Sequence, residues 1–235
     1  MPEQQDRSGL IREFCSLSLE KREIAFIYLG YAGIILKVED RVVAIDIGSL
    51  LGNREIAAFS NLDLLLFTHT HYDHYNRART RKMLEKTRAH IVAQQQVAED
   101  LKGRVPLDRL TTAKSGISIR AGGFEIISVN GIHPRPISIY RIRKGKFSVF
   151  HGGDSGYSPV KDYPAEVAFL PTGDPSPSCS PESALKFTID LKPSVAVAMH
   201  GKPAQINRFK DLVKKDIPNT TVIIPKKYDV ETVAL

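Results

Sequence analysis

The sequence predicts an α/β protein in which two sheets pack face to face and helices cover their outer surfaces. Three observations favour this class. Short apolar runs recur from Ile24 to the C-terminus, turn residues separate the first of them, and helical patterns appear later in each half. No linker rich in Pro, Gly or Ser divides residues 1–235, so we expect a single domain with its core at about 24–224.

The first half begins with short strands. Turn-forming residues at 30–33 and 39–41 separate the first three apolar runs, which we expect to form consecutive antiparallel strands. A denser buried strand follows, and then a helix with Met83 and Leu84 on its inner side. The expected strands are Ile24–Leu29, Ile34–Val38, Val42–Ile45, Leu64–Phe67 and Ile91–Ala93, and the expected helices are Arg77–Lys86 and Gln95–Leu101.

The second half repeats this alternation, with tight turns at Gly122–Gly123 and Lys144–Gly145. One helix carries a proline near its first turn and Glu182 at its positive end. We interpret Pro171–Pro181 as a loop near the site. The expected strands are Ile117–Arg120, Phe124–Val129, Ile137–Ile142, Phe147–Phe150, Val167–Leu170, Val195–Met199 and Thr221–Ile224, and the expected helices are Pro181–Leu191 and Ala204–Lys215.

Composition and charge narrow the class of protein. Hydrophobic residues make up 42% and charged residues 25%, as in an ordinary globular protein. The net charge of +7 favours an anionic substrate, although a well-solvated basic surface explains it equally well. No Lys/Arg run resembles a nucleic-acid tail, and no stretch resembles a signal peptide or membrane span, so we expect a cytoplasmic location. We expect Cys15 and Cys179 to be free thiols.

The strongest functional signal is the segment Thr68–His74, which reads THTHYDH and directly follows an expected strand. Imidazole nitrogens and carboxylate oxygens are the ligands that zinc prefers in open catalytic sites. His69 and His71 face the same way in an extended segment, and a turn into the next helix would bring Asp73 and His74 to a second position. The alternative, a polar loop in which Asp73 only caps the helix, does not account for the three histidines.

The spacing His69-x-His71-x-Asp73-His74 resembles the signature of the metallo-β-lactamase superfamily. This resemblance implies a four-layered αβ/βα sandwich and a metal-dependent hydrolase. Further segments resemble the other motifs of the family, and like His69 each follows an expected buried strand, where site residues gather in α/β proteins. They centre on Asp46, His133, Asp154 and His200.

Carried over residue by residue, the resemblance implies two divalent metal ions at one site. The first ion would take His69, His71 and His133, and the second would take Asp73, His74 and His200. Asp154 would bridge the two ions, and Asp46 would accept a hydrogen bond that orients a ligating histidine. Zinc suits this histidine-rich set best, with manganese and iron as alternatives.

The implied mechanism is attack by a metal-bound hydroxide on a carbonyl carbon or phosphorus, with Asp73 as the catalytic residue that orients it. His151, Tyr72 and Tyr75 are candidates for a general acid by proximity in the sequence only. His151, Arg135 and Lys202 are candidates for substrate contacts. A supporting or core role is equally open for His151, and surface charge is the simpler role for Arg135 and Lys202.

The resemblance favours a small anionic ester, lactone or phosphodiester as substrate, and looks closest to the small hydrolases related to ascorbate-6-phosphate lactonase. No cysteine stands at a metal position, unlike in antibiotic-cleaving members with a cysteine ligand. Two alternatives stay open: a mononuclear iron enzyme of the sulfur dioxygenase type, and a non-catalytic metal-binding module. Exposed sheet edges are also compatible with a homo-oligomer.

Overall fold

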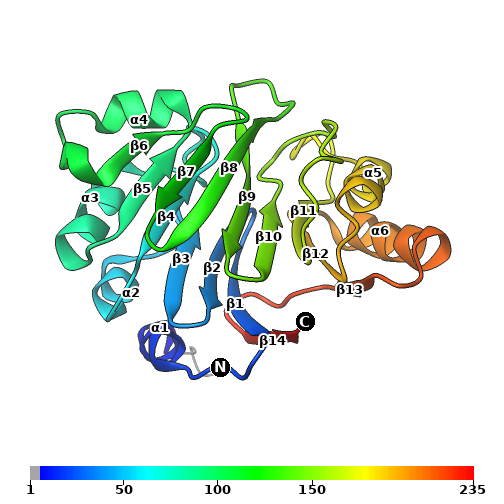
Figure 1. The fold of residues 1–235 in the computed structure, drawn as a ribbon, viewed down its shortest axis with the longest axis horizontal. Coiled ribbons are helices and arrows are strands. Elements are labelled where there is room, and N and C mark those ends of the chain that lie inside the picture. The colour runs from blue at the N-terminus through cyan, green and yellow to red at the C-terminus, as the bar shows by residue number, and fades with distance from the viewer. Residues whose placement is uncertain (1–5) are drawn as a thin grey trace.

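Two seven-stranded mixed sheets form the centre of the molecule in the computed structural model, which describes residues 6–235 (Figure 1). The first sheet has the order β14-β1-β2-β3-β4-β5-β6 and the second β13-β12-β11-β10-β9-β8-β7. The first comprises β1 (Glu23–Gly30), β2 (Gly33–Val38), β3 (Arg41–Ile45), β4 (Leu64–Phe67), β5 (His90–Ala93), β6 (Leu110–Thr112) and β14 (Val230–Ala234). The second comprises β7 (Ser118–Ala121), β8 (Phe124–Asn130), β9 (Ser138–Lys144), β10 (Phe147–His151), β11 (Val167–Pro171), β12 (Val195–Met199) and β13 (Thr221–Ile223).

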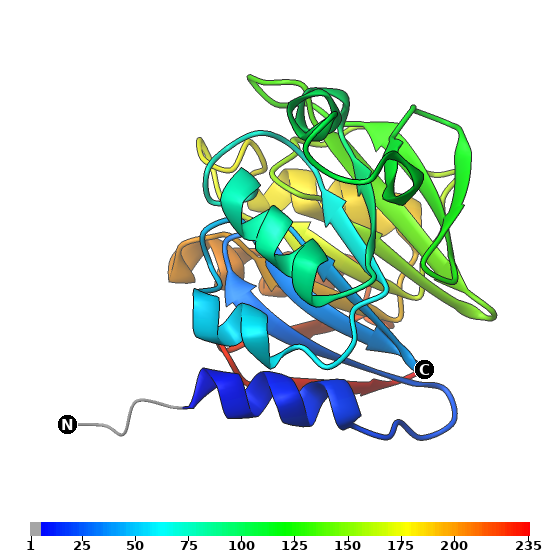
Figure 2. The same ribbon diagram turned by 90° about the vertical axis from the view of Figure 1, so that its left-hand side faces the viewer.

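Helices cover the outer face of each sheet, as Figures 1 and 2 show. The first four lie on the first sheet and the last two on the second. They are α1 (Arg7–Ser16), α2 (Asn53–Ala58), α3 (Arg77–Lys86), α4 (Gln95–Leu101), α5 (Pro181–Leu191) and α6 (Pro203–Asp216), and a short 3₁₀ turn spans Leu107–Arg109. The expected α/β class and four-layered sandwich are therefore confirmed.

The core has three layers, and alternation along the strands divides the side chains among them. In β1, Ile24 and Phe26 point between the two sheets, whereas Ala25 and Ile27 point toward the helices. Both faces of this strand are buried, which explains its continuous apolar run. Across the middle layer, the rings of Phe26 and Phe169 meet edge to face at 5.0 Å.

The sequence analysis did not anticipate α1, α2, β6 or β14. The inward side chains of α1 are Ile11, Phe14 and Cys15, a helical spacing on an otherwise polar segment. β14 pairs antiparallel with β1, and only Val233 of this strand is buried. Both cysteines are free and buried, as expected, and they lie in different core layers. In the described range 6–235, no helix combines the length and apolar character needed to cross a bilayer.

The strand directions bring the candidate site residues to one end of the sandwich. β3 and β4 are parallel in the first sheet, and β10, β11 and β12 are parallel in the second. Asp46 and His69 follow the first pair, while Asp154 and His200 follow β10 and β12. Loops at the carboxyl ends of parallel strands converge, so the fold itself assembles the site.

Candidate metal centre

Two groups of candidate ligands lie side by side at this end of the sandwich. In each group one potential ligand atom from every residue lies within 4.8 Å of the others. The first group is His69, His71 and His133, and the second is Asp73, His74 and His200. A third, fully buried set, Asp46, His69 and His74, overlaps both. His69 of the first group and His74 of the second lie next to each other, with their ring centroids 4.1 Å apart. These groups match the two ligand sets that the resemblance implied.

Local backbone geometry explains how the segment Thr68–His74 supplies ligands to both groups. His69 and His71 extend from the end of β4, and the N–H groups of His74 and Tyr75 then donate to the carbonyl oxygen of His71 at 3.0 and 2.8 Å. This turn redirects His74 toward the second group. The cap of the following helix α3 is Asn76, whose side chain accepts from the Arg79 N–H at 3.1 Å. Helix capping is therefore not the role of Asp73.

The carboxylate of Asp46 is fully buried and forms hydrogen bonds that position His74 and Thr68. Its Oδ2 lies 2.8 Å from Nδ1 of His74, and its Oδ1 accepts from the Thr68 N–H at 2.8 Å. Asp46 and His200 both have left-handed backbone, with φ of 49° each, at the points where their strands end. Strained backbone of this kind concentrates at functional sites.

Thr68 extends this support to a second ligand. Its hydroxyl donates to Oδ2 of Asp46 at 2.6 Å and lies 2.9 Å from Nδ1 of His69. Because the hydroxyl hydrogen goes to the carboxylate, its oxygen is the acceptor for Nδ1–H of His69. This tautomer leaves Nε2 of His69 free to bind a metal ion. The sequence analysis missed Thr68, although it stands directly before the first histidine of the motif.

Asp154 lies against the second group. Its Oδ2 is 3.2 Å from Nε2 of His74 and 3.4 Å from Nε2 of His200. The first of these contacts is close, yet within the described part of the chain Nε2 of His74 has no hydrogen-bond partner. Two atoms that approach each other without a hydrogen bond are arranged as ligands of a common cation would be.

The donor set fits divalent metal ions. Among the described residues, Nε2 of His69, Nε2 of His74 and Oδ1 of Asp154 are buried polar atoms without a hydrogen-bond partner. Such atoms are costly unless a ligand satisfies them. Three unpaired polar atoms converge here with neighbouring imidazoles and carboxylates, and metal coordination would satisfy all three.

The local environment lowers the pKa of all three histidines of the first group. Burial, followed by the positive charge of His74, lowers the pKa of His69 to about 3. Burial also lowers the pKa of His133, and burial together with the charge of Arg135 lowers that of His71. All three imidazoles are therefore neutral at pH 7, the state that binds metal.

In the second group, neighbouring carboxylates raise the pKa of a histidine instead of lowering it. Burial opposes protonation of His74, but Asp46 and Asp154 outweigh it and raise its pKa to about 10. Burial likewise opposes ionisation of Asp154, yet the adjacent imidazoles of His200 and His74 hold the pKa of Asp154 well below its ordinary value. The metal-free site keeps a proton on His74, in the region that a cation would otherwise occupy.

Two candidates from the sequence lie elsewhere than their proposed roles require. His151 is fully buried, with Nε2 donating to the Ala32 carbonyl at 2.8 Å and Nδ1 accepting from the Gly153 N–H at 3.2 Å. Both of its nitrogens are engaged within the protein, which fits a buried supporting role for His151. Tyr75 is also buried, and its hydroxyl donates to Asp100, away from the ligands. The remaining histidine, His90, lies outside the site, with Nε2 2.8 Å from the Thr111 hydroxyl.

The remaining candidates lie at the surface. Tyr72, between two candidate ligands, is 75% exposed. Arg135 is exposed, and its backbone N–H lies 3.2 Å from Nδ1 of His133. Lys202 is exposed at the N-cap of α6, two residues after His200. Each of the three residues stands within two positions of a candidate ligand in the sequence.

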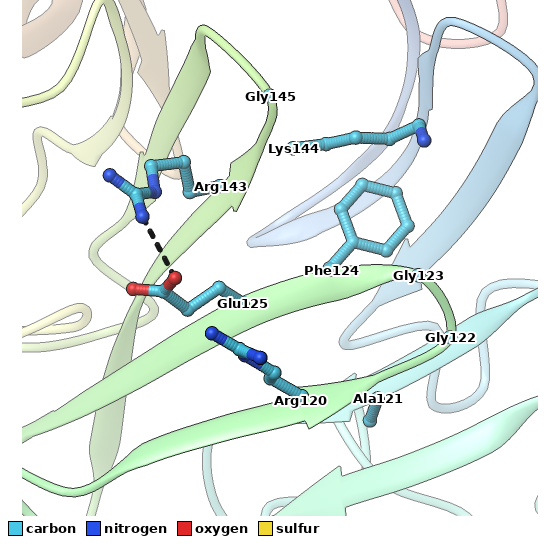
Figure 3. A pocket seen from close by; sticks show the side chains of 9 residues that line it. All are labelled: Arg120, Ala121, Gly122, Gly123, Phe124, Glu125, Arg143, Lys144 and Gly145. Atoms are coloured by element: carbon cyan, nitrogen blue, oxygen red, sulfur yellow. Dashed lines mark hydrogen bonds and ion pairs between the residues drawn. The ribbon is translucent and has the colours of Figure 1, made fainter.

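A separate surface pocket of about 560 Å³ lies at the turns that join β7 to β8 and β9 to β10 (Figure 3). Glu125 lies between Arg120 and Arg143 on adjacent strands, and Nη2 of Arg143 lies 2.8 Å from its carboxylate. The ligand-bearing loop follows the other end of β8, whose seven residues span about 20 Å. The pocket is therefore a salt-bridged surface feature remote from the candidate metal centre.

Fold and site together define a two-sheet sandwich with a His/Asp metal centre at the strand ends. A family model described as "Beta-lactamase superfamily domain" matches residues 49–201. The chain belongs to this superfamily, and its structure has the metallo-β-lactamase fold. No curated protein matches the sequence.

Solved structures share this fold at low identity. The novel metallo hydrolase Igni18 from Ignicoccus hospitalis is 23% identical, with a TM-score of 0.77, over 91% of this chain and 99% of the other. The diiron β-hydroxylase CmlA from Streptomyces venezuelae is 14% identical, with a TM-score of 0.66, over 92% and 55%. A diphosphatase of the PhnP family is 14% identical, with a TM-score of 0.62, over 91% and 98%. The fold thus supports more than one chemistry.

Proposed function

We propose that the chain is a metal-dependent hydrolase with a binuclear His/Asp site that cleaves a small anionic ester, lactone or phosphodiester. The observation that carries this proposal is the adjacency of the two ligand groups, with the rings of His69 and His74 4.1 Å apart. Two adjacent groups of three ligands are what a pair of divalent ions requires. Among the similar structures, Igni18 is described as a metallo hydrolase and the PhnP-family protein as a diphosphatase, and both descriptions are consistent with hydrolysis.

Zinc is the ion we propose for both positions, because five of the seven candidate ligands are imidazoles. The first ion would take His69, His71 and His133, and the second would take Asp73, His74, His200 and Asp154. Asp154 would be shared by the two ions, since its Oδ2 faces His74 and His200 and its Oδ1 has no hydrogen-bond partner among the described residues. When bound, the ions would lower the pKa of water and stabilise negative charge on the substrate.

The protein side chains divide the remaining tasks. Asp73 is only partly buried, and its Oδ2 lies 3.6 Å from Nε2 of His74, so it can accept a proton at the edge of the site. Arg135 lies close enough to lower the pKa of His71 and would attract an anionic group toward the first set. Lys202 would do the same beside His200.

We also propose a closer kinship with the small hydrolases related to ascorbate-6-phosphate lactonase. The support is the compact spacing of the motif from His69 to His74 and the absence of a cysteine among the candidate ligands. A second candidate function is iron-dependent oxygen chemistry, which the likeness to the diiron enzyme CmlA brings into consideration.

Metal-stripped protein, reloaded separately with Zn, Mn or Fe, tests the proposed function. We expect Zn or Mn to restore hydrolysis of bis-p-nitrophenyl phosphate or a simple lactone, and His69→Ala to abolish it. His90→Ala is the matched control, because His90 bonds Thr111 outside the site. Oxygen uptake with iron and no hydrolysis would favour the second candidate. Metal binding without any turnover would identify a non-catalytic module.

A further inference from the structure

Tyr31 lies at the tip of the β1–β2 hairpin, beside the candidate metal centre. Its ring is 43% exposed and meets the ring of His200 edge to face at 5.1 Å. An aromatic ring is thus both accessible to solvent and in contact with a candidate ligand. Apolar and aromatic side chains of this kind line small-molecule sites around a few polar groups.

The backbone of Tyr31 is in a conformation that disfavours a tyrosine. Its φ is 51°, in the left-handed region that glycine or asparagine adopts at low cost in hairpin turns. A bulky side chain there carries strain. The side chain is nevertheless present and half exposed, so fold stability does not explain it. Left-handed backbone also occurs at Arg22 and Glu39 in other turns, so the contact of the Tyr31 ring with His200, together with the strain, points to a functional role.

Hydrogen bonds fix the hairpin tip to the loops that carry the candidate ligands. The Tyr28 hydroxyl donates to the Tyr31 carbonyl at 3.0 Å and accepts from the His200 N–H at 3.2 Å. On the other side, His151 links the Ala32 carbonyl to the Gly153 N–H, at 2.8 and 3.2 Å. The Tyr31 ring is therefore positioned relative to the site before a ligand arrives.

Lys227 lies beside Tyr31, and Ile132 stands next to the candidate ligand His133 in the sequence. Nζ of Lys227 lies 5.8 Å from the centroid of the Tyr31 ring, within the range of a cation–π contact. Ile132, directly before His133, is 58% exposed, although its N–H donates to Ser155 and its carbonyl accepts from Gly156. Hydrogen bonds thus hold the Ile132 backbone while its apolar side chain faces solvent. The Lys227 ammonium, beside Tyr31, can attract an anion.

We propose that Tyr31 is a substrate-binding residue that packs against a planar aromatic group of an anionic ester. The Lys227 ammonium would lie near the negative charge, and Ile132 would extend the apolar surface. This inference rests on the proposed hydrolase function and narrows its substrate class to aryl-bearing anions. The ring would contribute to affinity and specificity and would not take part in bond cleavage.

Binding of two unreactive anions tests the proposal without relying on turnover. Zinc-loaded protein would be titrated with phenylphosphonate and methylphosphonate, which differ in the aromatic ring. We expect tighter binding of phenylphosphonate by about 10-fold, the typical gain from aromatic stacking. Tyr31→Gly should remove this difference, whereas Tyr31→Phe should keep it. Ile189→Ala on α5, which removes an equally exposed apolar side chain elsewhere, is the control.

Zinc content and thermal midpoint of Tyr31→Gly separate substrate binding from structural support. We expect unchanged zinc content and a midpoint no lower than that of the wild type, because glycine relieves the left-handed strain. A Tyr31→Gly protein that still prefers phenylphosphonate, weakens both anions equally or loses zinc would overturn the proposal. A Tyr31-dependent preference in a protein that hydrolyses no ester would instead refute the proposed function alone.

Discussion

The hydroxyl of Thr68 donates to Oδ2 of Asp46 at 2.6 Å, in the fully buried layer beneath the candidate ligands. Through this bond a single carboxylate orients two histidines: His74 directly, and His69 through the threonine oxygen. Partners of this kind hold the tautomer and the ring orientation of metal ligands. Several outcomes for variants of these residues follow from the arrangement.

Thr68→Val should weaken zinc binding by about 10-fold to 100-fold, because the variant keeps the side-chain shape but removes the acceptor for Nδ1 of His69. Thr68→Ser keeps the hydroxyl and should stay close to the wild type. Competition with a chromogenic chelator measures both affinities. Equal affinity of the valine variant and the wild type would show that Thr68 does not orient His69.

Asp46→Asn should also weaken zinc binding by about 10-fold to 100-fold while leaving every candidate ligand in place. The new amide NH2 would stand either at the Oδ2 position, where Nδ1 of His74 and the Thr68 hydroxyl donate, or at the Oδ1 position, where the Thr68 N–H donates. In both orientations at least one donor loses its acceptor. The same chelator assay applies. Unchanged affinity would return Asp46 to a purely structural role at the end of β3.

Gly48→Ala should disrupt the loop that carries the second ligand group. A Cβ at this position would lie 2.2 Å from the Asp73 carbonyl oxygen and 2.7 Å from the His74 nitrogen, and φ is +29°. We expect a loss of about 2–4 kcal/mol in the free energy of unfolding, together with weaker metal binding. Gly103→Ala is the matched control, because its φ is also positive but its Cβ would meet open space.

Urea unfolding of the two glycine variants separates clash from backbone strain. Gly103→Ala should cost only about 1 kcal/mol, the expense of left-handed backbone. If both variants lose the same stability, the close approach of Gly48 to Asp73 is not a constraint on the loop.

Asp100→Asn should lower stability by about 1–2 kcal/mol at pH 7 in metal-free protein, because Asp100 accepts from Arg77 and, at 2.6 Å, from the Tyr75 hydroxyl. Hydrogen bonding from Arg77 and then Tyr75 lowers the pKa of Asp100 against the opposing effect of burial. A depressed folded-state pKa adds stability above the unfolded value of about 3.9, and this stability is lost as pH falls.

Urea unfolding at pH 7 and near pH 3.5 checks the sign of this dependence. The difference in stability between the wild type and Asp100→Asn should shrink at the lower pH. Tyr75→Phe, which removes one donor to Asp100 and keeps the ring in the core, should lose part of the same stability. A difference that grows toward low pH would contradict the assigned role of Asp100.

Elements with two buried faces could be predicted well from the sequence. Leu64–Phe67 and Val195–Met199 are continuous apolar runs, and the structure has strands with these same bounds. β14 could not be found in this way, because its stability comes from pairing with β1, about two hundred residues earlier, and only Val233 is buried. Its pattern alone resembles an exposed polar segment.

The candidate ligands could be predicted because their spacing is local, from His69 to His74, or because each follows a buried strand. The hydrogen bonds that position these ligands could not be predicted, because they join segments that are far apart in the sequence. Tyr28 accepts from the N–H of His200, 172 residues later. Proximity in the sequence was misleading for His151 and Tyr75, whose side chains turn away from the ligands into buried hydrogen bonds.

The central claim is that both ligand groups bind metal ions that are needed for hydrolysis. Elemental analysis of zinc-loaded protein, alongside turnover of bis-p-nitrophenyl phosphate and a lactone, tests this most directly. We predict about two zinc ions per chain in the active wild type, and reduced zinc with no turnover in Asp154→Ala, which removes the carboxylate between His74 and His200. A single ion per fully active chain, or normal activity of Asp154→Ala, would contradict the two-metal account.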